Sequence, residues 1–290
     1  MKSAAAALSL MLLLSQPGCR RESAEPETIQ DLIAREFASP EGWTELNHET
    51  IRLFSEGRKA ESTAMLESFV ELHPDFADGH FALAANHEFM AVDLKDQPEQ
   101  VAERTRHLEA AVAHYERFRE LKSDPDDRAQ ASNLLVNLYG PDGLNRMDEA
   151  VAVAREYTME RPKDPGGFAK LARSLRQQGS YDAGTQVLLE AVRRFPPGER
   201  DTQLSDELIA YVQETPQLSR ETAERLLAEA LSDAERQMAV PATRGLGLML
   251  KSRAVQASAQ RIEQNPDRQR ELEAESERLQ REGMALLLQN

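Results

Sequence analysis

A fixed spacing of 34 residues within the stretch 147–196 constrains this chain more than any other feature of its sequence. Five positions in the first half that hold an apolar, small or proline residue are each matched by another such residue 34 residues later. The pairs are Met147 and Tyr181, Ala150 and Gly184, Ala154 and Leu188, Tyr157 and Ala191, and Pro162 and Pro196. A period of about 34 residues is typical of helix pairs that stack on one another.

The unit from Pro165 to Pro196 has the pattern of two amphipathic helices. Each half carries an apolar stripe with helical periodicity. The stripes are Phe168, Leu171, Ala172 and Leu175, and then Gly184, Val187, Leu188, Ala191, Val192 and Phe195. The break at 178–180 contains Gly179, which permits a chain reversal, and Pro196 ends the second helix.

These residues resemble the tetratricopeptide repeat (TPR) family. Ala172 and Gly184 match the small positions of its helices A and B, and Ala150 matches that of the preceding helix B. The resemblance spans roughly residues 43–231 and implies an all-α, right-handed superhelical solenoid of antiparallel helix pairs. The alternative is an unrelated helical bundle in which the 34-residue spacing arises by chance. One pair cannot bury its apolar face alone, so three or more repeats are expected.

The domain prediction places about five TPR-like repeats at 39–231 and a C-terminal helical region at 232–290. Gly245 and Gly247 disfavour a helix interior in that region, and a final polar helix begins at Asn265-Pro266. Leucines at 272, 279 and 286 recur every seven residues, but their companion positions are polar or glycine. The last helix is therefore predicted to cap the solenoid and not to form a dimer seam.

The N-terminus has the composition of an export signal. Lys2 precedes an apolar run at 4–14, and Gly18-Cys19 follows. This stretch resembles a bacterial lipoprotein leader, which implies a signal peptide at 1–18 and lipidation of Cys19. Residues 19–38 then form a tether and a short capping helix. The alternatives are an ordinary secretory signal, which leaves a soluble exported or periplasmic protein, and an uncleaved anchor.

The expected location is the periplasmic face of the outer membrane, with the lipid on Cys19 as the membrane contact. The residue after this cysteine is Arg20, whereas the resemblance links Asp at that position to inner-membrane retention. Cys19 is the only cysteine, so no intrachain disulfide can form.

Charge and motifs narrow the class of function. The net charge of −15 argues against nucleic-acid binding, which needs a basic face. The phosphate-loop, H-E-x-x-H, C-x-x-C and G-x-S-x-G motifs are absent from the sequence. We therefore expect no catalytic residues and no cofactor. The predicted function is a scaffold or adaptor that binds a segment or helix of a protein partner, and the resemblance implies a role in assembling an envelope complex.

Two groups of side chains are candidates for the partner groove. Lys170, Arg173 and Arg176 form a basic stripe, and the resemblance implies that the two arginines face the groove. Such a stripe suits an acidic segment or the C-terminal carboxylate of a partner. The alternative is a basic stripe paired with neighbouring acids. Phe81 and Phe89 are candidate apolar anchors, with core packing as the other interpretation.

Four histidines give an alternative function. His80 and His87 lie on one expected helix, and His107 and His114 lie on the next. Antiparallel packing would bring His80 near His114 and His87 near His107. Imidazole is a common metal ligand, so a small-ligand or metal-binding protein is the alternative hypothesis. The other interpretation is that these histidines pack at a helix interface, and the main hypothesis assigns no metal ligand.

Overall fold

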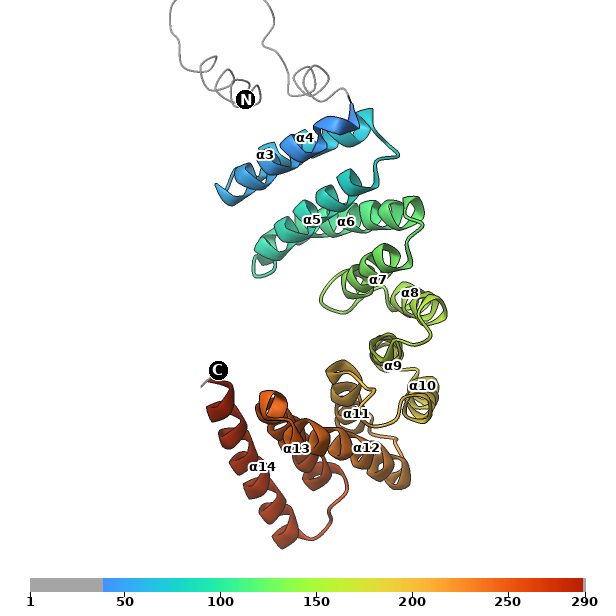
Figure 1. Ribbon diagram of the computed structural model, residues 1–290, viewed down its shortest axis with the longest axis vertical. Helices are drawn as coiled ribbons and strands as arrows, with labels where there is room; N and C mark the ends of the chain where they lie inside the picture. The colour runs from blue at the N-terminus through green and yellow to red at the C-terminus, as the bar shows by residue number, and fades with distance from the viewer. Residues whose placement is uncertain (1–38, 289–290) are drawn as a thin grey trace, which may run out of the picture. The chain divides into compact units, whose positions relative to one another are not determined.

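The computed structural model describes residues 39–288, and this part of the chain is helical throughout, with short turns and no strand (Figure 1). The helices are α3 (Trp43–Ser55), α4 (Lys59–Leu72), α5 (Ala77–Asp93), α6 (Val101–Leu121), α7 (Pro125–Tyr139), α8 (Met147–Glu160), α9 (Pro165–Gln178), α10 (Tyr181–Arg194), α11 (Thr202–Glu214), α12 (Arg220–Ala239), α13 (Arg244–Arg261) and α14 (Pro266–Leu287). Three single-turn 3-10 helices are η1 (Pro40–Gly42), η2 (Pro98–Gln100) and η3 (Pro241–Thr243). The all-α prediction is confirmed.

The predictions for the N-terminus fall outside these residues. The signal peptide at 1–18, the tether at 19–38 and Cys19 lie beyond the described part of the chain. Within residues 39–288, none of the helices combines the length and the apolar character that a membrane crossing requires.

The ends of α9 show how local sequence sets the helix boundaries. The Asp164 carboxylate caps the helix by accepting a hydrogen bond of 2.9 Å from the backbone N–H of Gly166, and Pro165 occupies the first turn. Gly179 ends the helix in the left-handed conformation at φ +86°, and Ser180 N–H donates back to the Leu175 carbonyl at 2.8 Å. The pair of helices predicted within 165–196 is confirmed, with the second helix ending at Arg194 and Phe195 already extended.

The chain divides into two compact units, and the boundary falls within α7, between Ala131 and Ser132. In the first unit, α3 packs on α4 and α5, α4 packs on α5, and α5 packs on α6. Small apolar clusters form these interfaces. Leu46, Leu53, Met65 and Phe69 join α3 to α4, while Leu66, Val70 and Leu83 join α4 to α5.

The second unit contains the largest apolar core among the described residues. It joins α9, α10, α11, α12 and α13, and its fully buried members include Leu188, Leu204, Leu208, Ile209, Tyr211 and Leu226. In this unit α9 packs on α8, α10 and α11. Helix α9 is therefore covered by neighbours from before and after it in the sequence.

The C-terminal part differs from its sequence prediction in one boundary. Helix α12 runs without a break from Arg220 to Ala239, so the boundary expected between residues 231 and 232 falls inside it. No proline or glycine interrupts 220–239, and Ala223, Leu227, Ala230 and Ala234 keep a single buried stripe along the helix.

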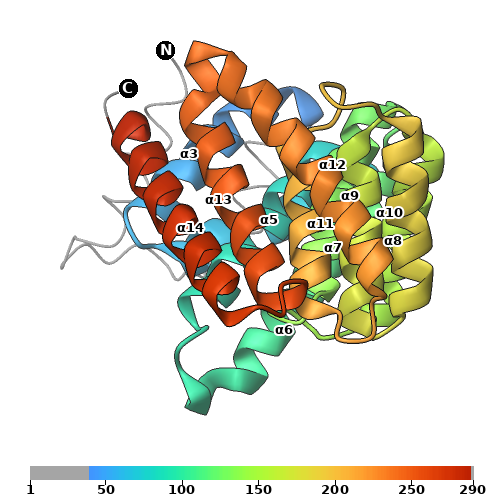
Figure 2. The ribbon, with the colours of Figure 1, turned by 90° about the horizontal axis from the view of Figure 1, so that it is seen from below.

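Figures 1 and 2 both show α14 lying alongside α13. Leu279 is buried against Leu248 and Val255, and Leu272 and Leu286 pack on the same cluster. The leucines that recur every seven residues thus contact the preceding helix of their own chain.

The glycines of α13 are used for close helix contacts. A Cβ atom on Gly247 would lie 2.6 Å from the backbone N of Met238 and 2.8 Å from the backbone O of Ala234, both on α12. A Cβ on Gly245 would likewise come within 3.2 Å of the Gly283 carbonyl on α14. Gly247 requires glycine because backbone atoms of α12 cannot move aside cheaply, whereas a methyl group at Gly245 would need its neighbours to shift by only a few tenths of an ångström.

We predict that Gly247→Ala destabilises the protein by about 1–3 kcal/mol, because the methyl group meets backbone atoms. In an uncrowded helix interior the same change stabilises by about 1 kcal/mol, so the sign of the effect is diagnostic. Urea unfolding measures it, with the exposed Gln256→Ala as a control in the same helix. A gain of stability in Gly247→Ala would contradict the close contact.

Candidate functional site

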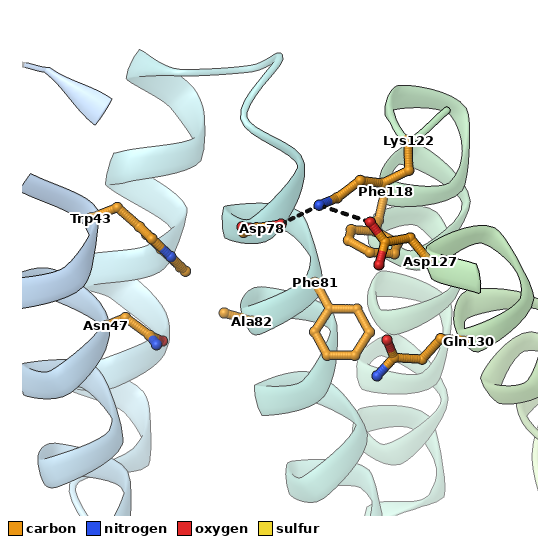
Figure 3. A pocket seen from close by; sticks show the side chains of 9 residues that line it. All are labelled: Trp43, Asn47, Asp78, Phe81, Ala82, Phe118, Lys122, Asp127 and Gln130. Atoms are coloured by element: carbon orange, nitrogen blue, oxygen red, sulfur yellow. Dashed lines mark ion pairs between the residues drawn. The ribbon is translucent and has the colours of Figure 1, made fainter. Parts of the chain in front are cut away.

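The first unit carries a solvent-open groove of about 410 Å³. Residues from the starts of α3, α5 and α7 and from the end of α6 line it (Figure 3). They are Trp43, Asn47, Asp78, Phe81, Ala82, Phe118, Lys122, Asp127 and Gln130. Four helices from different parts of the sequence therefore meet around one surface, which we call the α3–α5–α7 groove.

Ring contacts fix the aromatic side of this groove. The Phe81 ring meets Phe118 at 4.9 Å between centroids and Tyr115 edge-on at 5.3 Å. The ring centroid of Trp43 lies 5.3 Å from the ring centroids of both Phe69 and Phe76. Because these rings pack on neighbours, the apolar surface of the groove is already ordered before any ligand binds.

The polar side of the groove combines one ion triad and two amides. The Lys122 ammonium lies 2.8 Å from an Asp78 oxygen and 3.1 Å from an Asp127 oxygen, and Figure 3 shows it between them. Hydrogen bonds to Asp78 and Asp127 outweigh partial burial and raise the pKa of Lys122, so it stays charged at neutral pH. Asn47 and Gln130 add carboxamides, each of which can donate and accept hydrogen bonds.

The two phenylalanines predicted as anchors lie in different places. Phe81 lines the groove, whereas Phe89 is outside the groove lining, 58% exposed, with its ring 5.8 Å from Phe54. Sequence reasoning missed the polar lining residues Asn47, Asp78, Lys122, Asp127 and Gln130. Asn47 and Gln130 lie on the second turns of α3 and α7, which a helix-face argument could have found. Lys122 follows the end of α6, and its position depends on the turn into α7.

The basic stripe on α9 is paired with side chains of α11, the first helix of the following pair. Arg176 Nε donates to Glu207 at 2.9 Å, and Arg173 Nε donates to the other oxygen of the same carboxylate at 3.0 Å. Arg176 also pairs with Glu214, and Lys170 Nζ donates to Gln203 at 2.8 Å. Arg176 and Glu207 are buried, with side chains 8% and 1% exposed. The guanidinium of Arg176 therefore joins α9 to α11, and it takes no part in the α3–α5–α7 groove.

The four histidines form two pairs between α5 and α6, as the antiparallel arrangement predicts. The Nδ1 atoms of His80 and His114 lie 3.0 Å apart, and so do those of His87 and His107. The rings of His87 and His114 stack with an angle of 7° between their planes. The seven-residue spacing on each helix thus produces a ladder of four imidazoles, which we call the histidine ladder.

Hydrogen-bond partners define the tautomers at one end of the histidine ladder. His80 Nε2 lies 2.9 Å from the Pro74 carbonyl, which can only accept, so His80 donates from Nε2. In neutral His80 the Nδ1 atom is then an acceptor, and His114 donates to it from its own Nδ1. His114 Nε2 is left with a lone pair. Such a bond needs at least one neutral ring as the acceptor, because two imidazolium ions would both be donors.

The environment keeps the interior histidines neutral. Burial, assisted by the neighbouring imidazoles, lowers the pKa of His87 and that of His114 to about 4. His87, His107 and His114 also line a pocket of about 360 Å³ with Glu67, Glu103 and Arg106. Within residues 39–288, however, no set of three or more His, Cys, Asp or Glu side chains has the arrangement of a metal site. The metal-binding alternative therefore remains a prediction, and the described residues provide no set of ligands for it.

Comparison of the sequence with protein-family models and with curated proteins found no match.

We predict that the histidine ladder makes stability fall as the pH drops from about 6.5 to about 4. The folded pKa of His87 and His114 lies below the unfolded value, so the unfolded chain binds more protons in this window. Each pKa unit corresponds to about 1.4 kcal/mol per group, so the loss reaches several kcal/mol. Urea unfolding at a series of pH values measures it.

The double variant His87→Leu/His114→Leu should show a shallower pH dependence between these limits. His48→Leu, at an exposed position on α3, serves as the control and should keep the wild-type slope. Equal slopes in all three proteins would rule out the ladder as the titrating element.

The buried ion pair between α9 and α11 generates a third prediction. Glu207→Gln should destabilise the protein by about 3 kcal/mol, because it removes the buried carboxylate that Arg176 and Arg173 share and leaves Arg176 only the exposed Glu214 as a counter-ion. Glu214 is 60% exposed, so Glu214→Gln should stay within about 1 kcal/mol of wild type. Thermal unfolding distinguishes them, and equal effects of the two changes would contradict the assignment.

Proposed function

We propose that this protein is a non-catalytic scaffold or adaptor that binds an extended segment of a protein partner in the α3–α5–α7 groove. The observation that carries the proposal is the composition of the groove, where aromatic rings and two carboxamides line one solvent-open surface. Carboxamides can pair with both the N–H and the C=O of a peptide backbone, and aromatic rings can bury an apolar side chain.

An extended peptide suits this groove better than a compact small molecule. The lining residues come from four helices and the turn after α6, and the surface is open to solvent. Small-molecule sites are typically concave and bury most of the ligand. A peptide segment can instead lie across successive helices and contact each with a different side chain.

We further propose that the helix pairs belong to a right-handed superhelical solenoid of the TPR kind. Support comes from the order of contacts within each unit. First helices of successive pairs pack together, as α3 with α5 and α9 with α11. Second helices pack on the next first helix in three places, α4 with α5, α8 with α9 and α12 with α13. Stacked repeats make such nearest-neighbour contacts.

The location is a separate part of the proposal and rests on the sequence alone. Gly18-Cys19 after an apolar run supports a lipid anchor in a bacterial envelope, and a role in envelope-complex assembly is the use we propose for a tethered adaptor. Replacing Cys19 with Ser should move the protein from the membrane to the soluble fraction. If the variant stays in the same fraction as the wild type, the lipid-anchor hypothesis is wrong, and the groove hypothesis is unaffected.

The groove hypothesis predicts that the full-length protein selects binders from a displayed library of random twelve-residue peptides. The double variant Asn47→Ala/Gln130→Ala should then bind the selected peptides about tenfold more weakly, because each lost hydrogen bond is worth about 0.5–1.5 kcal/mol. Fluorescence anisotropy with labelled peptides measures the affinity.

The control is Gln186→Ala, which removes an exposed amide from α10 in the second unit and should leave affinity unchanged. Selected peptides that bind all three proteins equally well would show that the groove is not the binding site.

A further inference from the structure

The charges of the ionisable side chains in the α3–α5–α7 groove do not cancel. Two carboxylates, Asp78 and Asp127, share the single ammonium of Lys122, so this triad keeps one net negative charge. The two carboxylates are reachable from solvent, since their side chains are 52% and 39% exposed. A carboxylate accepts up to about four hydrogen bonds, so each retains acceptor capacity beyond its contact with Lys122.

The aromatic rings beside this triad favour a cation as well. The Lys122 ammonium lies 5.2 Å from the centre of the Phe118 ring, and Phe81 lies against that ring. An aromatic face attracts a positive charge, and it can also cover the methylene groups of a long basic side chain. The same surface therefore offers carboxylate oxygens for a charged head group and aromatic carbon for its stem.

The charge of the whole protein acts in the same direction. With 50 Asp and Glu against 35 Lys and Arg, the net charge of −15 attracts basic segments and repels acidic ones. The basic stripe on α9 does not offset the negative charge, because Arg176 and Arg173 are paired with Glu207.

We infer that the α3–α5–α7 groove selects an extended segment that carries a lysine or arginine next to an apolar or aromatic residue. The basic head group binds the free oxygens of Asp78 and Asp127, and the apolar neighbour packs on Phe81 and Trp43. This inference rests on the proposed function, and it reverses the sign of the partner expected from the basic stripe, which would take an acidic segment.

Lys122 has a defined part in this selection. It separates two carboxylates that would otherwise repel each other, and it competes with the basic side chain of the ligand. Removing its charge should therefore raise the affinity for a basic peptide. General damage to the groove would lower affinity, so this gain is a result that a merely structural role for Lys122 cannot produce.

The test uses the full-length protein and the displayed twelve-residue peptides. Selected sequences should be enriched in Lys or Arg adjacent to an apolar residue. A synthetic copy of one selected peptide should lose about three- to fivefold in affinity when its basic residue is replaced with Gln, and more when it is replaced with Glu. Raising the salt concentration should shrink this difference.

Matched variants locate the charge effect. Asp78→Asn and Asp127→Asn should each reduce the advantage of the basic peptide over its Gln counterpart, and Lys122→Gln should increase it. Asp75→Asn is the control, because Asp75 is 82% exposed, pairs with Arg117 and does not line the groove. Thermal unfolding confirms that each variant is folded.

The outcomes separate the two proposals. Peptides that need Asn47 and Gln130 but show no preference for Lys or Arg would overturn the charge selection and leave the groove as a binding site. Selection of acidic peptides would also overturn it. If no peptide depends on Asn47 and Gln130, both the groove function and this inference fail.

Discussion

The structure depends on one constraint, which is that an amphipathic helix pair exposes more apolar surface than its two members can cover. Leu66 and Val70 of α4 are buried only because α5 brings Leu83 against them, and Leu188 of α10 is buried in a core that also includes Leu208 of α11. At both places the helix that follows a pair covers apolar surface that the pair alone leaves exposed. The last helix obeys the same rule, since α14 places Leu279 against α13 and leaves a largely charged face to solvent.

Polar side chains are buried where two helices can satisfy each other. The histidine ladder and the Arg176–Glu207 pair both lie at helix interfaces, and both place donors against acceptors. Burial then makes these groups sensitive to protonation or to the loss of one partner. The groove residues differ from them, because Asp78, Asp127 and Gln130 remain open to solvent and can reach a ligand.

Local periodicity in the sequence was enough to predict individual helices and their pairing. Apolar stripes with Gly179 between them predicted α9 and α10, and the seven-residue spacing of histidines predicted their pairing across α5 and α6. Contacts between distant residues were not predictable in this way. Glu207 lies 31 residues from Arg176, and only the packing of α11 on α9 brings them together. Lys122 reaches Asp78 and Asp127 because it lies in the turn after α6, within ion-pair distance of the first turns of both α5 and α7, a geometry that no local pattern encodes.

The central claim is that a peptide segment lies in the α3–α5–α7 groove, and site-directed photo-crosslinking tests it most directly. A benzophenone side chain introduced at Gln130 in the groove should crosslink to a selected peptide, and mass spectrometry should find the adduct on α7. The same group at Ala113, exposed on α6 and outside the groove lining, should not crosslink. Equal crosslinking at both positions, or crosslinking at Ala113 alone, would contradict the account.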